Sequence, residues 1–85
     1  MRIQLKLFAS LREAVNLSDL SLDLPNEIKT IQQLREYLSQ RGSVWADVFA
    51  SHKPIRAAIN HQMVDMDELL QDGAEVAFFP PVTGG

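Results

Sequence analysis

The sequence predicts one small α+β domain in which a main helix packs across a single β-sheet. Three observations support this fold class. Segments whose apolar residues alternate or run together lie near both ends of the chain, as strands require. An amphipathic segment with a helix-start signal lies between them, and 85 residues are enough for only one domain. No repeat, linker or low-complexity stretch divides the sequence.

The first third of the chain is expected to form two antiparallel strands joined by a short helix rather than by a tight turn. Residues 2–7 and 20–24 each alternate between polar and apolar side chains, which is typical of strands with one buried face. Ser10 and Glu13 stand three residues apart, the spacing of a capping box, and predict the start of the connecting helix. Asn16 is expected to end that helix.

A second capping-box pair, Thr30 and Gln33, predicts the start of the main helix. We expect this helix to run from about residue 31 to residue 41 and to end at Gly42, because glycine readily takes the left-handed conformation of a helix cap. Its apolar stripe should cover the sheet, since three apolar residues follow one another at helical spacing: Ile31, Leu34 and Leu38.

Residues 43–50 predict a short helix or a turn folded against the edge of the domain. Trp45, Val48 and Phe49 lie at helical spacing in this segment. We favour a core role for Trp45 because large aromatic side chains usually serve burial. Contact between Trp45 and a partner protein stays open as the alternative.

The second half of the chain predicts three further strands. Residues 55–59 and 62–64 would pair through a turn at Asn60-His61, because Asn tolerates positive φ. Residues 65–70 are expected to form one helical turn anchored by Leu69 and Leu70, and Asp72-Gly73 is a turn signal. The final strand, residues 74–79, is almost wholly apolar, which suits a central place in the sheet.

Composition excludes several classes of function. The formal charge is −3 and the eight basic residues are scattered, which argues against nucleic acid as a partner. No apolar run approaches the roughly 20 residues of a membrane span and no signal peptide is visible, so the cytoplasm is the expected compartment. The sequence contains no cysteine and therefore has no thiol to act as a nucleophile or to carry a persulfide.

The polar residues of the domain form no recognisable catalytic, cofactor or metal site. His52 and His61 fall in predicted loops and are expected to be exposed. The acidic cluster of Asp65, Asp67 and Glu68 lacks the glycine and ligand spacing of a calcium loop, so we interpret it as a solvated turn. Phosphate-binding glycine loops and nucleophile motifs are also missing. The domain is not expected to be catalytic by itself.

The last eight residues, Phe-Phe-Pro-Pro-Val-Thr-Gly-Gly, are the part of the chain that suggests chemistry. Pro80 and Pro81 end the last strand because proline cannot donate to a sheet ladder. The six residues from 80 to 85 reach at most roughly 20 Å. The two glycines lack side chains that would block a narrow channel, and a terminal carboxylate is ionised near neutral pH. We interpret residues 80–85 as a tail that carries a carboxylate into another protein.

This ending, together with Phe-Ala-Ser-Leu-Arg-Glu at residues 8–13, resembles the small, sulfur-carrying subunit of molybdopterin synthase over essentially the whole chain. The resemblance implies a ubiquitin-like β-grasp fold for residues 1–79, with a mixed sheet of about five strands and the last strand lying centrally beside the first. It implies no bound cofactor. ATP would be used by a partner activating enzyme related to ubiquitin-activating enzymes, and the large synthase subunit and a sulfur donor protein would be further partners, with the two synthase subunits forming a heterotetramer.

The resemblance also assigns roles to single residues. Gly85 would be adenylated, converted to a thiocarboxylate and used to give sulfur to a cyclic pyranopterin, with Gly84 as the glycine before it. Contact with the partner enzymes would fall on the rest of the tail and its base: Phe79, Pro80, Pro81, Val82 and Thr83. Three other functions stay open, namely a thiamine-pathway sulfur carrier, a ubiquitin-like modifier joined to lysines, and a passive interaction domain.

Strand alternation separates the two phenylalanines that precede the tail. Phe78 falls on the same face as Val76 and Ala74, whereas Phe79 falls with Ala77 and Glu75. The face that carries Glu75 should be the wetter one. We therefore predict that Phe78 belongs to the core and that Phe79 faces a partner.

Overall fold

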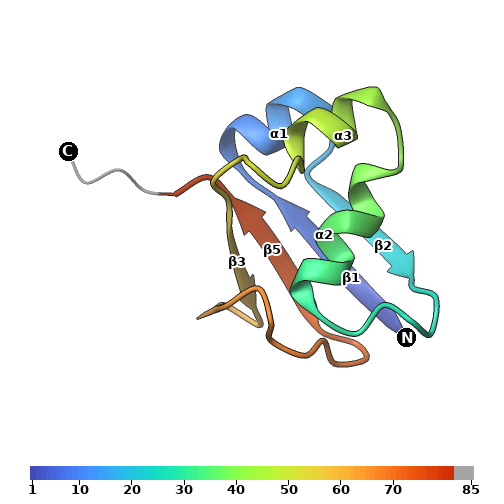
Figure 1. Ribbon diagram of the computed structural model, residues 1–85. Coiled ribbons are helices and arrows are strands. Elements are labelled where there is room, and N and C mark those ends of the chain that lie inside the picture. Colours follow the sequence, from blue (N-terminus) through green and yellow to red (C-terminus); the bar gives the residue numbers. More distant parts are fainter. Residues whose placement is uncertain (82–85) are drawn as a thin grey trace.

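The computed structural model describes residues 1–81 and contains one five-stranded mixed sheet with three helices (Figure 1). In chain order the elements are β1 (Arg2–Leu7), α1 (Ala9–Val15), β2 (Asp19–Asp23), α2 (Ile31–Ser39), α3 (Ser43–Val48), β3 (Arg56–Ile59), β4 (Gln62–Val64) and β5 (Glu75–Phe79). The predicted strands are confirmed to within one residue at each end. The division of the chain at residue 79 into domain and tail stays a prediction.

The last strand lies at the centre of the sheet, whose order is β2-β1-β5-β3-β4. β5 runs parallel to β1 and antiparallel to β3, while β1 and β2 form the antiparallel pair that their alternation predicts. Antiparallel β3 and β4 complete the other side. This is the order expected for the β-grasp topology, and the α+β prediction with a mixed sheet is confirmed.

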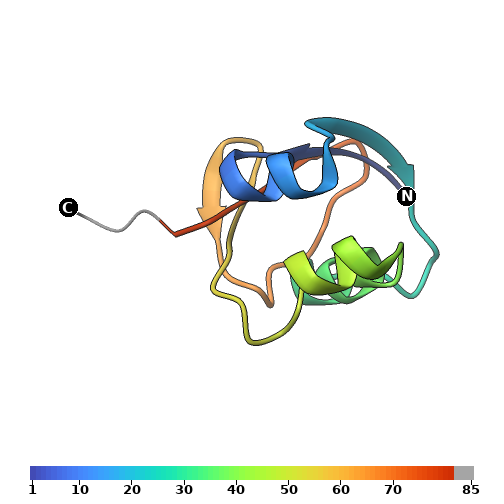
Figure 2. The ribbon, with the colours of Figure 1, turned by 90° about the horizontal axis from the view of Figure 1, so that it is seen from above.

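Helices α2 and α3 lie on one side of the sheet, and α1 lies at the end of the sheet (Figure 2). α2 crosses one face of the sheet, and α1 and α3 sit together at the end where β1 and β5 finish (Figures 1 and 2). Phe78 is fully buried between these layers, and its ring meets that of Phe49 edge-on at 5.3 Å. Trp45 stacks on Phe49 at 5.9 Å and packs partly buried against the core, which confirms its core role.

The predicted capping box at the start of α1 is wrong. The helix begins at Ala9, its N-cap is Phe8, and no side chain caps it, so Ser10 lies inside the first turn. The reason lies in the sheet, because the Phe8 N–H donates to the Phe78 carbonyl at 3.3 Å and Phe8 is still extended. The chain then turns at Ala9, whose φ is 52°, a left-handed value that is unusual for alanine. Asn16 ends the helix, as predicted, and it takes the left-handed conformation there.

The capping box of α2 is confirmed, whereas the predicted end of this helix is wrong. Thr30 and Gln33 exchange side-chain and backbone hydrogen bonds in the reciprocal capping arrangement. The helix ends at Ser39 instead of residue 41, and Gly42 is extended, with a φ of 160°. Gly42 is the N-cap of α3, because its carbonyl accepts a hydrogen bond from the Ala46 N–H at 2.8 Å. The immediate start of α3 replaces the expected glycine cap.

Residues 65–70 form a turn and an extended bridge instead of the predicted helical turn. The carbonyls of Met66 and Glu68 accept hydrogen bonds from the first N–H groups of α2, at 2.8 and 3.1 Å. Those N–H groups have no partner within their own helix, so they hold this segment in an open conformation. Leu70 is buried and anchors the segment, whereas Leu69 is 63% exposed and does not. The turn at Asn60-His61 is confirmed, since both residues have positive φ.

Candidate functional site at the end of β5

The tail leaves the sheet from a strand that is held on both sides. Leu7 of β1 pairs with Phe78, and Arg56 of β3 pairs with Phe79. The hydrogen bond from the Phe8 N–H extends the β1 side of this ladder by one further residue. Pro80 and Pro81 follow without N–H donors, so backbone pairing ends there. The base of the tail is therefore fixed in the middle of the sheet.

The structure covers only part of the predicted site. Phe79, Pro80 and Pro81 are half-buried at the end of β5. The predicted site residues Val82, Thr83, Gly84 and Gly85 lie outside the described residues. Phe78 belongs to the core cluster with Val76 and Ala74, as strand alternation predicts, and Phe79 lies on the opposite face of the sheet. Contact between Phe79 and a partner stays a prediction.

An apolar patch lies on the β5-β3-β4 half of the outer sheet face, which is the face that α2 does not cover. Strand register places Ala77 beside Ala58 and Ala58 beside Met63 on this face, next to Phe79. Both alanines are buried yet stand outside the core cluster. Phe8 continues the alternation of β1 onto this face beside Phe79 and is 46% exposed, while Met63 is 60% exposed. We call these five residues the apolar patch: Phe8, Ala58, Met63, Ala77 and Phe79.

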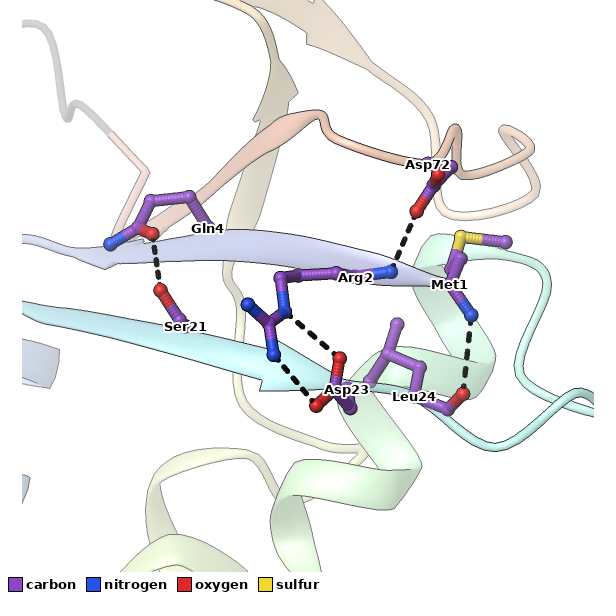
Figure 3. Close-up of polar contacts among 7 residues, drawn as sticks. All are labelled: Met1, Arg2, Gln4, Ser21, Asp23, Leu24 and Asp72. Atoms are coloured by element: carbon purple, nitrogen blue, oxygen red, sulfur yellow. Dashed lines mark hydrogen bonds and ion pairs between the residues drawn. The ribbon is translucent and has the colours of Figure 1, made fainter.

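The β1-β2 half of the same face is polar and its side chains are paired with one another (Figure 3). The Arg2 guanidinium binds both carboxylate oxygens of Asp23, at 2.9 and 3.0 Å. The Ser21 hydroxyl donates to the Gln4 side chain at 2.7 Å. Lys6 forms an ion pair with Asp19 at 2.7 Å. These groups already have partners, so this half offers fewer polar contacts to another protein than its composition suggests.

These ion pairs predict a dependence of stability on pH. Hydrogen bonds from Lys6 and Arg2 hold the pKa of Asp19 and of Asp23 below the usual 3.8. A carboxyl group whose pKa is lowered by folding stabilises the fold above its unfolded pKa, and that contribution is lost as the pH falls through the folded pKa. The double variant Asp19→Asn, Asp23→Asn should therefore melt below the wild type at neutral pH, and the difference should shrink as the pH falls below the usual carboxyl pKa and the two aspartates of the wild type become protonated. Melting temperatures that differ equally at neutral and at acidic pH would contradict this assignment.

A cavity of about 210 Å³ lies beside the base of the tail. Its lining includes Pro80, Leu11 of α1, Val48 of α3 and the segment from Lys53 to Ile55 that leads into β3. That segment is held by Arg35, the one charged residue among those described that is buried. The Arg35 guanidinium donates to the carbonyls of Phe49, Ala50 and Lys53, and burial lowers its pKa from the usual value.

The two histidines and the acidic cluster singled out in the sequence are exposed, as predicted. His52 and His61 are exposed, although His61 lies 3.3 Å from the Glu75 carboxylate. Asp65, Asp67 and Glu68 are exposed as well. Within residues 1–81 no group of three His, Asp or Glu side chains is placed to hold a metal ion. None of the helices described here is long and apolar enough to cross a membrane.

This strand order, with α2 across one face and a tail leaving the central strand, defines a ubiquitin-like β-grasp domain. The model of the family described as "ThiS family" matches residues 5–85, and the chain belongs to this family. The Escherichia coli K12 protein named molybdopterin synthase sulfur carrier subunit is 39% identical to the chain over 85 residues, which cover 98% of the chain and 99% of that relative. The Haemophilus influenzae protein of the same name is 36% identical over 78 residues, covering 92% and 93%. The resemblance found in the sequence is thereby confirmed.

A solved structure shares the fold across nearly the whole length. The small archaeal modifier protein 1 of Methanosarcina acetivorans superposes with a TM-score of 0.69 at 26% identity, covering 99% of the chain and 96% of that structure. It is named a modifier protein, whereas the Escherichia coli and Haemophilus influenzae relatives are named sulfur carrier subunits.

Sequence reasoning missed three features of this site. The apolar patch joins residues of β3, β4 and β5 with Phe8, which follows β1, so only the strand register brings it together. The sequence does not reveal that the strand alternation continues to Phe8, because the apparent helix signal at Ser10 suggests that a helix starts there. Arg35 lies among apolar residues in the helical pattern and could have been noticed as a charged residue next to Leu34 on the buried stripe.

Proposed function

We propose that the protein is the sulfur carrier of a molybdopterin synthase, and that its reactive atom is the carboxyl carbon of Gly85. The observation that carries the proposal is the combination of a central, doubly paired β5 with the Pro-Pro-Val-Thr-Gly-Gly sequence that follows it. Near-full-length similarity to two proteins named molybdopterin synthase sulfur carrier subunit supports it. The absence of cysteine leaves the terminal acyl carbon as the place for sulfur.

The chemistry needs activation first, because a carboxylate resists attack by a sulfur nucleophile. An activating enzyme joins the Gly85 carboxylate to the α-phosphate of ATP and releases pyrophosphate. Sulfide supplied by a donor protein then forms a bond to the acyl carbon, the bond from that carbon to AMP breaks, and a thiocarboxylate results. In the large subunit this sulfur forms a bond to a pyranopterin carbon and displaces an oxygen substituent, and water then attacks the acyl carbon, breaks its bond to sulfur and returns the terminus to a carboxylate. A closed site there excludes water until the transfer and holds the sulfur close to its acceptor.

The length of the tail determines where both enzymes must bind. Residues 80–85 reach at most roughly 20 Å, so an active site that receives Gly85 must lie close to the end of β5. The apolar patch surrounds that point, and apolar side chains with Phe79 among them suit the centre of a protein interface. The proposed contacts are Phe79, Pro80 and Pro81 at the base and Val82 and Thr83 further along.

Intact-mass measurement after incubation with an activating enzyme, ATP and a sulfur source tests the proposal. We expect a gain in mass equal to the exchange of one oxygen for one sulfur, located on Gly85 by fragmentation. The modified protein should then convert the pyranopterin when the large subunit is added. Attachment to lysines would instead indicate a modifier, transfer only to a thiamine precursor would indicate the other carrier class, and no change would indicate an inert domain.

Substitution of the penultimate glycine tests whether the partner channels are narrow. Gly84→Val adds a branched side chain where the backbone of the tail must pass closely, and it restricts a residue free to use glycine-only conformations. We expect the variant to fold normally and to bind the large subunit somewhat more weakly than the wild type does. The rate of adenylation or of sulfur transfer should fall by about 100-fold. Adenylate formation and single-turnover transfer should be assayed separately.

The Gly84 experiment needs a control variant and has one outcome that would contradict the prediction. Thr83→Val places the same side chain one residue earlier and is the matched control, because the threonine that it replaces already has a branched side chain of similar size. Near-normal rates of both steps in Gly84→Val would mean that the channels are wide and that the diglycine has no steric purpose.

A further inference from the structure

Arg56 is a charged residue that adjoins the apolar patch at the base of the tail. It is the first residue of β3 and lies directly opposite Phe79 in the register of β3 with β5. Because side chains alternate along a strand, Arg56 lies on the same outer face as Ala58 two residues on. Arg56, Phe79 and Phe8 therefore form one row across the sheet, at the point where the tail leaves it.

The Arg56 side chain is exposed and has no strong partner within residues 1–81. None of the hydrogen bonds or ion pairs among these residues involves its guanidinium, whereas Arg2 and Lys6, the other cations on this face, are bound to Asp23 and Asp19. Asp65 and Glu68 line a cavity of about 210 Å³ together with Arg56, yet neither forms an ion pair with it. Arg56 thus keeps its five donors available to another molecule.

An enzyme that covers the apolar patch must also cover Arg56. Enclosing a guanidinium without an anion is costly, because the lost hydration is not replaced. A carboxylate opposite it removes this cost, and the apolar surroundings strengthen the resulting hydrogen-bonded ion pair. Arginine is well suited to such a contact, since its planar fork binds both carboxylate oxygens and its long stem packs on apolar neighbours.

We propose that Arg56 is a specificity-determining contact of this surface, and that the enzyme receiving the tail presents a carboxylate to it at the mouth of its channel. The inference rests on the proposed function, because it assumes an enzyme that acts on Gly85. It adds the chemistry of that partner's surface, which is apolar where it meets Phe79 and acidic where it meets Arg56. Arg56 takes no part in the chemistry and acts only in binding.

The test compares charge removal at Arg56 with the same change far from the tail. Arg56→Gln keeps the length and polarity of the side chain and removes the charge, and Arg56→Glu reverses it. Lys29→Gln and Lys29→Glu are the matched controls, because Lys29 is exposed and lies just before α2, where its carbonyl accepts a hydrogen bond from the Leu70 N–H of the segment that precedes β5. Affinity for the activating enzyme and for the large subunit is measured by calorimetry at several salt concentrations, with melting temperatures recorded for every variant.

We expect Arg56→Gln to weaken binding to at least one of the two enzymes by roughly tenfold and Arg56→Glu to weaken it further, while the Lys29 variants bind like the wild type. The salt dependence of that affinity should become shallower in Arg56→Gln, which a loss of folding alone would not cause. If the activating enzyme is the affected partner, KM for the carrier in the adenylation assay should rise with kcat nearly unchanged. A lysine in place of the partner's carboxylate should restore binding to Arg56→Glu.

Two outcomes separate the inference from the function on which it rests. Unchanged affinity and salt dependence of Arg56→Gln with both enzymes would overturn the role of Arg56, even if the wild type becomes thiocarboxylated. Failure of the wild type to acquire sulfur, with activating enzyme and ATP shown to be active, would overturn the proposed function first.

Discussion

Deletion of Gly85 is expected to abolish thiocarboxylate formation and sulfur transfer without a measurable loss of stability. Shortening the tail by one residue moves the terminal carbon by about 3.5 Å. Misplacement of a reacting atom by about 1 Å can already slow a reaction by roughly 100-fold, so the loss should exceed that factor. The fold should be unaffected because the core cluster lies within the sheet and helices, and chain ends add few packed contacts.

Comparison with a second deletion shows what the lost residue contributes. Deletion of Thr83 gives a tail of the same length that still ends in two glycines. If reach alone matters, both deletions should be inactive in a reconstituted assay with purified partners; if the diglycine alone matters, the Thr83 deletion should retain activity. Continued molybdopterin formation by the Gly85 deletion would rule out the terminal acyl carbon of Gly85 as the sulfur site.

Much of the fold follows from patterns that are local in the sequence. Alternation in residues 2–7 and 20–24 predicts two strands because side chains of a strand face opposite sides in turn, and burial in the structure follows that alternation. The capping box of Thr30 and Gln33 is correct because both partners lie within one turn. Such signals depend on neighbours three or fewer residues away, which the sequence displays directly.

The errors arise where distant parts of the chain determine local structure. The Ser10 signal fails because sheet pairing with β5, about seventy residues further along, extends the backbone through Phe8. The segment at residues 65–70 is open because it satisfies the N–H groups of α2. The apolar patch and the position of Arg56 depend on strand register in the same way. Alternation separates Phe78 from Phe79, but only the register shows which side chains surround them.

Substitution of Phe78 by alanine is expected to cost about 3–5 kcal/mol of folding free energy. The side chain is fully buried, pairs edge-on with Phe49 and lies in the central strand, so neighbouring residues have little freedom to fill the space left behind. Small domains have a total stability of only about 5–15 kcal/mol. The melting temperature should therefore fall by at least about 12 °C, measured by calorimetry or circular dichroism.

Phe79→Ala is the matched variant, since it removes the same atoms one residue later and on the other face of the sheet. Its half-buried ring contributes less to the core, so the melting temperature should fall by only a few degrees, about a third of the Phe78 effect or less. Its affinity for the large subunit should fall by at least roughly 30-fold, as expected for an aromatic anchor at the centre of an interface. Affinity is to be compared at a temperature where both variants are folded.

Equal thermal destabilisation by the two substitutions would refute the assignment, because it would place both rings in the core. Normal binding of the large subunit by Phe79→Ala would show that Phe79 is not an anchor of the interface and that the apolar patch is not centred on it.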